Sequence, residues 1–257
     1  MNPDRAEISV VLITFNEAEN LRRTLPPLAE VTDDIVVVDS GSTDDTVALC
    51  ASYGARVIER PWEGYANAKN FGNLQARHDW ILSVDADEEL SPELVRSLHA
   101  LKPVDHTVYA LDRLTNFCGT WIRHSGWYPD WKIRLFNRTH VRWTGDFVHE
   151  HLKFPEEFKV QRLEGKLLHW SYKSTDDHLQ RMQRYAELSA QKMYARGKAV
   201  SSLRRLLGPP FRFLRTYFLK AGILDGRYGW LISVRNARMV RLKYRHHAEL
   251  VRAEKKQ

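Results

Sequence analysis

Short apolar runs alternate with amphipathic segments through the first hundred residues of the chain. The apolar runs are rich in Val and Ile, which is typical of strands that are covered on both faces of a sheet. Four such strands are predicted, at residues 8–15, 34–40, 55–60 and 80–87. Helices are predicted between them, at residues 17–28, 41–54 and 65–78. Strands that alternate with helices in this way predict an α/β fold with a parallel sheet.

The pattern changes after Pro103. Residues 107–172 are rich in Trp, Tyr, Val and Arg, and their short alternating pieces predict mixed or antiparallel strands joined by long loops. A long helical pattern starts at Ser174, and Gly-Pro-Pro at 208–210 is expected to break the chain before a final basic, aromatic-rich section. We therefore expect two regions, at residues 1–173 and 174–257, the second of them helical.

Charge separates the same two regions. The chain has 257 residues and a formal net charge of +7. Residues 196–257 contain 16 Lys and Arg against 3 Asp and Glu, a local net charge of +13, which leaves −6 for the rest of the chain. A strongly basic tail on an acidic body indicates an anionic partner for the tail.

Cysteine content and the N-terminus favour a cytoplasmic protein. Only Cys50 and Cys118 are present, so no disulfide framework is implied and a reducing compartment is expected. The N-terminal residues "MNPDRAEISVV" do not have the charged segment and apolar stretch of a signal peptide. No apolar run approaches the roughly 18 residues that would indicate a transmembrane helix.

Acids and hydroxyls follow three of the predicted strands, at residues 14–17, 39–46 and 85–89. Ligands of parallel sheets bind outside the carboxyl ends of the strands, so these segments are expected to share one rim. Asp85 and Asp87 are separated by one residue, which places both side chains on the same side of an extended chain. Such carboxylates suit Mg²⁺ or Mn²⁺, ions that substrate phosphates usually complete. Alternatively, the acids at 85–89 begin a helix, because carboxylates favour a helix N-terminus.

A resemblance to a known family supports the first interpretation. The segments "VVLITFNEAENLRRTL", "IVVVDSGSTDDT" and "WILSVDADEEL" together resemble the nucleotide-sugar-binding half of the inverting family 2 glycosyltransferases, which have a GT-A fold. Four later segments resemble a bacterial subgroup that adds glucose to the inner core of lipopolysaccharide: "GWYPDWKIRLFNR", "GDFVHEHL", "LLHWSY" and "PPFRFLRTYFLKAGILDGRYGW". The resemblance covers nearly the whole chain.

The resemblance implies a fold and a division of labour. The fold is GT-A: a Rossmann-like, mostly parallel central sheet with helices on both faces, followed here by a basic helical extension. Residues 1–103 are implied to bind the nucleotide sugar, and residues 104–173 to contribute to the acceptor and the metal.

The resemblance also assigns residues to the donor. They are Thr14, Phe15, Asn16, Glu17, Asp39, Ser40, Gly41, Lys69, Asn70, Asp85, Ala86 and Asp87. Asp39 is implied to hydrogen-bond the uracil or ribose, which suits an acceptor-only carboxylate; its alternative role is to start a turn. Lys69 is implied to lie near the donor phosphates, with a solvent-exposed helical lysine as the alternative.

For the metal, the resemblance implies that Asp87 binds Mg²⁺ or Mn²⁺ through the donor diphosphate, with Asp85 facing the ribose or sugar and assisting. His169 matches a further ligand position, although a histidine beside Trp170 is also an ordinary packed residue. The sequence His-Glu-His at 149–151 could instead suggest zinc, but its spacing differs from the helical zinc pattern and no cysteine is nearby.

Inversion at the anomeric carbon requires a base near the attacking hydroxyl. The resemblance places an acid at Glu150, the candidate base, and Asp146 is its rival. The expected acceptor residues are Trp127, Tyr128, Trp131, Arg134 and His149. Aromatic faces stack on sugars and arginine binds phosphate through two hydrogen bonds, whereas core packing is the alternative for the tryptophans.

Residues 204–247 interleave basic side chains with apolar and aromatic ones. Charges are too frequent for a bilayer span, but the pattern suits a helix lying in the interface of an anionic membrane. We expect a peripheral association with the inner face of the cytoplasmic membrane. Packing of the tail on the acidic body is the alternative, and nucleic acid is disfavoured because the body has no known nucleic-acid motif.

The sequence therefore predicts an enzyme. The predicted reaction moves a hexose, glucose by the resemblance, from a UDP-sugar to an inner-core sugar of lipopolysaccharide by metal-assisted single displacement. Heptose-type and other hexose donors are alternatives to glucose. A non-catalytic protein that binds nucleotide sugars or nucleic acid is the alternative class, and a base at Glu150 would distinguish the two because a mere binder needs none.

Overall fold

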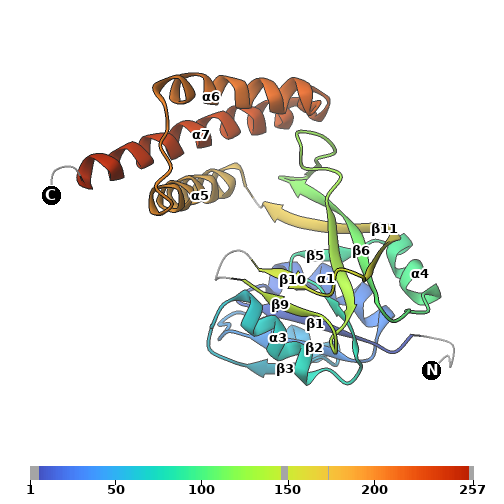
Figure 1. The fold of residues 1–257 in the computed structure, drawn as a ribbon. Helices are drawn as coiled ribbons and strands as arrows, with labels where there is room; N and C mark the ends of the chain where they lie inside the picture. The colour runs from blue at the N-terminus through green and yellow to red at the C-terminus, as the bar shows by residue number, and fades with distance from the viewer. Residues whose placement is uncertain (1–5, 146–149, 173, 255–257) are drawn as a thin grey trace. The chain divides into compact units, whose positions relative to one another are not determined.

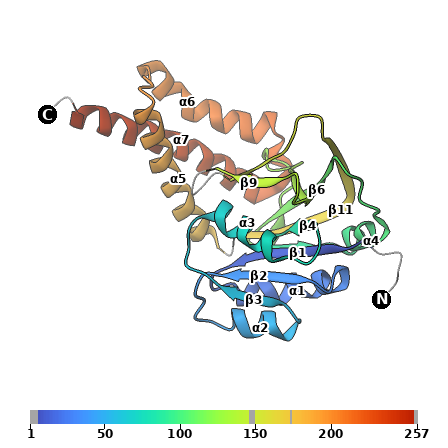
Figure 2. The same cartoon turned by 60° about the horizontal axis from the view of Figure 1, so that its bottom comes forward.

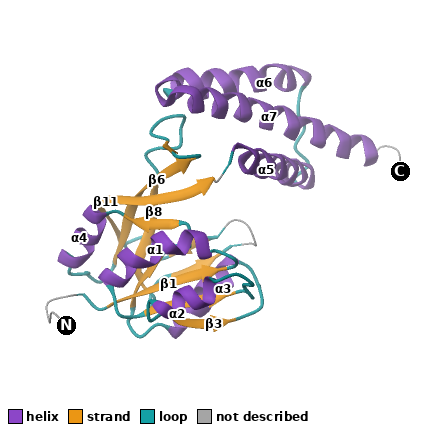
Figure 3. Ribbon diagram, turned by 180° about the vertical axis from the view of Figure 1, so that it is seen from behind, coloured by secondary structure: helices purple, strands orange, loops and turns teal. Residues whose placement is uncertain are grey.

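The computed structural model describes residues 6–145, 150–172 and 174–254, and it contains two compact units. The first unit comprises residues 1–114 and 130–170, and the second comprises residues 115–129 and 171–257. The first is built on a sheet, and the second consists mainly of helices (Figures 1 and 3). The predicted boundary after residue 173 lies close to the division at residue 170. The inclusion of residues 115–129 in the second unit has no counterpart among the predicted domains.

Four parallel strands form one half of the main sheet in the first unit. They are β1 (Ile8–Thr14), β2 (Ile35–Asp39), β3 (Arg56–Glu59) and β4 (Trp80–Ser83), in the order β3-β2-β1-β4 (Figure 2). Thr14 pairs with Asp39, and Val11 pairs with Ser83. The carboxyl ends of β1, β2 and β4 therefore meet at one edge of the sheet, which is the rim expected from the sequence.

Helices cover both faces of this parallel half. They are α1 (Ala18–Val31), α2 (Thr46–Ser52), α3 (Tyr65–Gln75) and α4 (Pro92–Ala100). Val10 of β1 packs in one apolar cluster with Leu21 of α1, whereas the next residue, Val11, packs in a second cluster with Ala66 of α3. Successive side chains of a strand point to opposite faces, so the unbroken apolar run of β1 serves two separate cores.

Gly72 allows α3 to lie close to the sheet. A Cβ atom at this position would be 2.5 Å from Val11 Cγ1 and 3.1 Å from Val38 Cγ2. Any side chain here would push α3, and with it Lys69 and Asn70, away from the rim.

The other half of the main sheet contains antiparallel pairs. Its strands are β5 (Glu88–Leu90), β6 (Thr107–Phe117), β7 (Thr120–Trp121), β8 (Trp131–Asn137) and β11 (Lys159–Tyr172). The antiparallel pairs are β4 with β8, β8 with β6, β6 with β7, and β11 with β5. The order continues from β4 through β8, β6 and β11 to β5, and β7 pairs with β6. A small separate sheet pairs β9 (Arg142–Thr144) with β10 (His151–Lys153). The predicted α/β fold, with mixed strands after Pro103, is confirmed.

The second unit is formed by α5 (Thr175–Ala195), α6 (Ser202–Leu214), the short turns η1 (Arg215–Leu219) and η2 (Gly222–Asp225), and α7 (Gly226–Glu254). Both α5 and α6 pack against α7 (Figures 1 and 3). Ser174 caps α5, since its Oγ accepts a hydrogen bond from the Asp177 amide at 3.1 Å. Among the described helices, none is both long and apolar enough to cross a membrane.

The expected break at residues 208–210 is wrong, because α6 continues through Pro209 and Pro210. The φ of proline is compatible with a helix. Its cost is the loss of one amide hydrogen bond and a clash of its ring with the carbonyl of the preceding turn. Packing supports the helix at this point: a Cβ at Gly208 would be 3.0 Å from the Tyr244 ring and 3.5 Å from Val240 Cγ1. The contact with α7 thus holds α6 together where local propensity would end it.

An aromatic cluster explains why residues 115–129 belong to the second unit. Phe117 is fully buried and lies 5.7 Å from Trp127, 5.5 Å from Tyr172 and 5.2 Å from Tyr228, measured between ring centroids. Ile122 and Ile232 complete the apolar contacts. The long end of β6 and the turn that follows it are therefore held by the helices of the second unit.

Candidate active site

The loops that follow β1 and β2 are joined through Asp39. Thr14 Oγ1 donates to Asp39 Oδ2 at 2.8 Å, and Asp39 Oδ1 accepts from the amides of Ser42 at 2.7 Å and Gly41 at 3.0 Å. The Asp39 side chain is almost completely buried. These contacts are those of a turn-starting aspartate, the alternative role given above, and they fix the shape of the loop. The Ser40 amide donates to the Thr14 carbonyl at 3.0 Å.

The same two loops are joined again through Asn16. Its amide donates to Ser42 Oγ at 2.8 Å, and its side-chain oxygen accepts from the Thr43 amide at 2.8 Å. Asn16 has a φ of +55°, a left-handed conformation that asparagine tolerates better than most residues. The Glu17 amide donates to Thr46 Oγ1 at 2.8 Å, while Phe15 is exposed at the tip. The rim loops are therefore rigidly shaped without a ligand.

Two cations hold Asp85 at the end of β4. Lys69 Nζ lies 2.9 Å from Asp85 Oδ1, and Arg134 Nη2 lies 2.5 Å from Asp85 Oδ2. Burial alone would raise the pKa of Asp85, but the charges of Arg134 and Lys69 outweigh it and hold that pKa well below its ordinary value. Asp85 is therefore ionised at neutral pH.

Lys69 is the centre of the cluster. Its side chain is only 2% exposed and reaches Glu150 Oε1 at 3.3 Å as well as Asp85. The Lys69 ammonium also lies 4.5 Å from the centroid of the Trp143 ring, a cation–π contact. The alternative of a solvent-exposed helical lysine is therefore wrong. Lys69 joins the acid at the end of β4 to the acid predicted as the base.

Arg134 is buried between carboxylates. Besides Asp85 it contacts Glu88 Oε1 at 2.5 Å, and Arg113 reaches Glu88 at 3.3 Å and Asp130 at 2.7 Å. Burial would lower the pKa of Arg134, but Asp85 and Glu88 raise it well above its ordinary value. In this structure Arg134, predicted on the acceptor side, acts as the counter-ion of Asp85 and Glu88.

Strand pairing brings Asp87 and His169 together. In the antiparallel pair of β5 and β11, His169 lies opposite Glu88, and the Trp170 amide donates to the Asp87 carbonyl at 2.8 Å. The resulting distance between His169 Nε2 and Asp87 Oδ2 is 3.2 Å. Trp170 is fixed by a hydrogen bond from its Nε1 to Glu89 Oε2 at 2.8 Å. Within the described part of the chain, no three His, Cys, Asp or Glu side chains gather as a ready metal-binding group.

Several other predicted residues have structural contacts. Asn70 exchanges two hydrogen bonds with the backbone of Trp143, at 2.8 and 2.9 Å, and so holds that ring over Lys69. The Ala86 carbonyl accepts from Thr24 Oγ1 at 2.9 Å, which ties the segment after β4 to α1. Asp146 and His149 lie outside the described residues.

The predicted acceptor aromatics are divided between the two units. Trp131, in the first unit, has the Arg162 guanidinium 4.5 Å from its ring centroid. Trp127 and Tyr128 belong to the second unit. Trp127 packs 5.7 Å from Phe117 and 5.6 Å from Tyr172, contacts that match the core-packing alternative.

The sequence did not predict the contribution of three residues to the cluster: Arg113, Trp143 and Glu88. Glu88 was visible beside Asp87, but only as an acid that could serve a helix N-terminus. Arg113 and Trp143 stand on strands whose partners no local pattern reveals. The only sequence signal was the presence of charged residues at positions that the strand pattern expected to be covered.

The chain is similar to several known proteins. Residues 9–152 match the model of the family described as glycosyl transferase family 2. The lipopolysaccharide core biosynthesis glycosyltransferase LpsC of Rhizobium meliloti is 31% identical over 219 residues, covering 82% of this chain and 80% of that protein. An uncharacterized glycosyltransferase of Rickettsia typhi is 29% identical over 239 residues, covering 89% of this chain and 82% of that protein. Among solved structures, S. aureus TarS 1-349 is similar over 93% of this chain and 91% of that chain, with 15% identity and a TM-score of 0.45.

The chain belongs to glycosyl transferase family 2. The family resemblance predicted from the strand-end motifs is therefore confirmed, and so is the prediction of an enzyme over a non-catalytic binder.

Proposed function

We propose that this glycosyltransferase moves a hexose, glucose by its family resemblance, from a UDP-sugar to an inner-core sugar of lipopolysaccharide with inversion at the anomeric carbon. The name of the Rhizobium relative, which refers to lipopolysaccharide core biosynthesis, supports this acceptor class. The observation that carries the proposal is the charge cluster at the rim, where Lys69 joins Asp85 to Glu150. One ammonium group thus joins a candidate donor-binding acid to a candidate base.

The loops after β1 and β2 are proposed to hold the nucleoside. Asp39 and Asn16 lock the two loops together, so their backbone groups are held in place before the donor arrives. Phe15 is 58% exposed beside these polar loops, and its ring is available to stack on a base. Gly41, with a φ of +88° and no atom within 4 Å of a Cβ position, lets the donor approach the backbone closely.

Asp87 and His169 are the proposed ligands of Mg²⁺ or Mn²⁺. A carboxylate oxygen and an imidazole nitrogen at one strand end fit such an ion, with the donor diphosphate and water taking the other positions. When bound, the ion neutralises the charge of the departing diphosphate. Asp85 is already held by Lys69 and Arg134, so we assign it to the hydroxyls of the ribose or sugar.

Glu150 is the proposed general base. The acceptor oxygen forms a bond to the anomeric carbon while the bond from that carbon to the diphosphate breaks, and the acceptor proton passes to the base. Lys69 holds Glu150 Oε1 at 3.3 Å, which orients the carboxylate and leaves Oε2 for the acceptor hydroxyl. Asp146 is the rival candidate for this role.

The proposal includes a peripheral association of residues 204–247 with the anionic inner face of the cytoplasmic membrane. An acceptor of the lipopolysaccharide core class is attached to a lipid, so an enzyme on the same surface meets it in two dimensions. The net charge of +13 on the C-terminal residues supports an anionic surface as partner.

A donor screen tests the proposal. Purified protein is supplied with UDP-, GDP- or ADP-sugars and Mn²⁺ or Mg²⁺, and release of the nucleoside diphosphate is measured with and without a truncated lipopolysaccharide core. We expect UDP-glucose to give core-dependent turnover. Turnover with ADP-heptose alone would assign a different donor, and turnover that does not depend on the core would assign a different acceptor.

A further inference from the structure

Helix α6 turns its apolar side chains away from the second unit. Five of its residues at helical spacing are half or more exposed: Leu203, Leu206, Leu207, Phe211 and Leu214. The apolar surface continues beyond the helix, where Phe218, Leu219, Ile223, Leu224 and Trp230 are also more than half exposed. An amphipathic helix normally buries this face in its own core. Exposed apolar surface of this extent marks an interaction site.

The face of α6 toward α7 includes Gly208 and Phe213, which packs 5.1 Å from the Trp230 ring, and basic residues lie beside it. Gly208 packs against Val240 and Tyr244. Burial lowers the pKa of Lys243 on α7, and the nearby charges of Arg212 and Arg204 on α6 lower it further. The Nε atom of Arg212 is buried without a hydrogen-bond partner in the part of the chain that the structure describes. Cations of the two helices therefore face one another.

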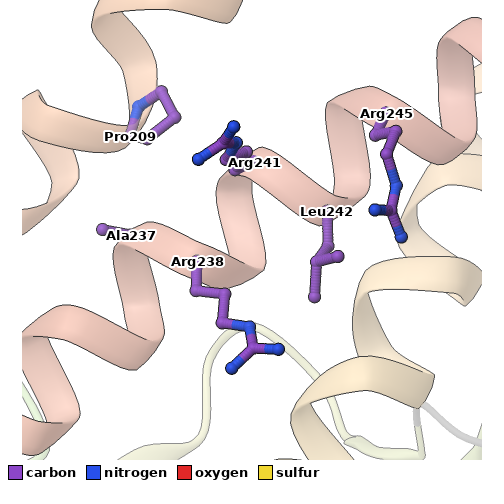
Figure 4. Close-up of a pocket in the computed structure, with 6 residues that line it drawn as sticks. All are labelled: Pro209, Ala237, Arg238, Arg241, Leu242 and Arg245. Atoms are coloured by element: carbon purple, nitrogen blue, oxygen red, sulfur yellow. The ribbon is translucent and has the colours of Figure 1, made fainter.

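A pocket of about 710 Å³ lies beside this contact (Figure 4). Pro209 of α6 and five residues of α7 line it: Ala237, Arg238, Arg241, Leu242 and Arg245. Figure 4 shows the three arginine side chains extending from α7 on both sides of Leu242, with Pro209 across from Arg241. The pocket therefore combines three guanidinium groups with an apolar wall.

Little negative charge balances these arginines. Arg245 has a loose contact with Glu249, with 3.7 Å between Arg245 Nε and the carboxylate. For Arg238 and Arg241, no carboxylate of a described residue lies within ion-pair distance. Like charges gathered on one helix repel one another, and an anion between them would remove the repulsion. Guanidinium groups bind phosphate through two parallel hydrogen bonds.

We propose that the pocket lined by Arg238, Arg241 and Arg245 binds the phosphoryl headgroup of an anionic membrane lipid while the exposed apolar face of α6 enters the acyl-chain boundary. The inference rests on the proposed membrane association and deepens it, because it names the face that docks and the chemical group that is recognised. A soluble phosphate would use the arginines but would leave the apolar face of α6 uncovered. A nucleic acid would likewise find no use for five exposed leucine and phenylalanine side chains.

Vesicle binding by charge-matched variants tests the site. The pocket variant carries Arg238→Gln, Arg241→Gln and Arg245→Gln, and the control carries Arg196→Gln, Arg205→Gln and Arg252→Gln, which are exposed and do not line the pocket. Both variants lose three positive charges. Full-length proteins are sedimented with vesicles of phosphatidylcholine alone or mixed with phosphatidylglycerol.

The wild-type protein is expected to bind the mixed vesicles and to bind phosphatidylcholine weakly. Basic residues near an anionic surface each contribute to the binding free energy, and the pocket arginines are proposed to hold the headgroup directly. The pocket variant should therefore lose about tenfold more affinity than the control. A third variant, Leu206→Ser with Phe211→Ser, should weaken binding in a way that added salt does not reproduce. Circular dichroism spectra and thermal unfolding show whether each variant has kept its fold.

Four outcomes would overturn the proposal. Equal losses in the pocket variant and the control would mean that only diffuse charge matters. Protection of the wild type from thermal unfolding by inorganic phosphate, lost in the pocket variant and without any vesicle binding, would assign a soluble phosphate. Binding of an oligonucleotide, again lost in the pocket variant and without vesicle binding, would assign nucleic acid. Absence of binding to every probe would leave the pocket without a ligand. Hydrolysis of a UDP-sugar by the pocket variant separates these failures from a failure of the proposed transferase activity.

Discussion

Two groups of cations, one in each unit of the molecule, differ in their partners. In the first unit, Lys69 and Arg134 each contact two carboxylates at distances between 2.5 and 3.3 Å. In the second unit, Arg238 and Arg241 contact no carboxylate among the residues that the structure describes. Burying a charge without a partner costs free energy. The buried Lys69 and Arg134 therefore need their carboxylates, whereas Arg238 and Arg241 are exposed and do not.

This difference fits the ligand that we propose for each unit. The paired cluster links Asp85 and Glu150 through Lys69, which fits the preorganisation that the proposed catalysis requires. The unpaired arginines leave a positive potential that attracts an anionic partner and is answered only when the partner arrives. We therefore assign Lys69 and Arg134 to the proposed transfer machinery, and Arg238 and Arg241 to the proposed docking surface.

The largest expected effect is the loss of the metal. Asp87→Ala removes the proposed carboxylate ligand at the strand end and should abolish divalent-dependent turnover, as excess EDTA should in the wild-type protein. The fold should persist, because Asp87 contributes its backbone carbonyl rather than its side chain to the pairing with Trp170. Release of UDP from the donor is the measurement. Full activity of the variant, or of the wild type in EDTA, would contradict the metal assignment.

Removing the base should have the next largest effect. Glu150→Gln keeps the size of the side chain but cannot take a proton, so turnover should fall on the order of 10²–10⁴-fold. Donor affinity, measured by UDP-sugar titration, should change little because Glu150 is assigned to the acceptor. Asp146→Asn is the matched control. A near-normal rate for Glu150→Gln together with a collapsed rate for Asp146→Asn would transfer the role to Asp146.

The same substitution in both units tests the comparison of charges directly. Arg134→Met leaves Glu88, which is completely buried, with Arg113 as its remaining cation at 3.3 Å. Breaking a buried pair by removing one partner should destabilise the protein by on the order of 3 kcal/mol. Arg241→Met should change the free energy of unfolding by less than about 0.5 kcal/mol, because that arginine is exposed and has no carboxylate partner among the described residues. Chemical denaturation of the two variants gives both values, and similar losses would remove the distinction between the units.

The sequence was sufficient for the elements and the rim, but not for the contacts across the sheet. The apolar runs of β1 and β2 predicted buried parallel strands, and the polar residues that follow them predicted the edge of the sheet at which a ligand is expected. The approach of His169 to Asp87 depends on the pairing of β11 with β5, which joins segments about eighty residues apart. Periodicity reports how one element is covered and says nothing about which partner covers it. Only the family resemblance brought His169 into consideration.

One rejected alternative and one wrong prediction have the same origin. Lys69 could be a surface lysine by its helical position, yet the close approach of α3 at Gly72 and the ring of Trp143 bury it. Pro209 and Pro210 were expected to end a helix, yet packing of Gly208 on Tyr244 keeps α6 continuous. In both places tertiary packing overrides what the local sequence favours.

The smallest effect concerns His178, a histidine of the second unit whose pKa is lowered. His178 lies 5.0 Å from the Phe117 ring and 4.8 Å from the Tyr172 ring, and its Nδ1 is 3.1 Å from Arg235 Nη1. Burial lowers the pKa of His178 to about 4, and the nearby charge of Arg235 adds to the effect while Asp177 opposes it. The positive charge of Arg235 therefore disfavours protonation of His178, because a protonated imidazole would face the guanidinium.

The sign of the pH dependence follows from the two states. The unfolded chain takes up a proton at His178 as the pH falls through about 6.5, whereas the folded protein takes it up only near pH 4. The contribution of His178 to stability is therefore complete above about pH 6.5 and is lost as the pH falls toward 4, with a magnitude on the order of 1–3 kcal/mol. Thermal unfolding of the wild type and His178→Gln at intervals between pH 7.5 and 4.5 measures it, since glutamine can still accept the hydrogen bond from Arg235 but does not titrate. The wild type should lose more stability than the variant over this range; parallel curves for the two proteins would show that Arg235 and the aromatic rings do not hold His178 neutral.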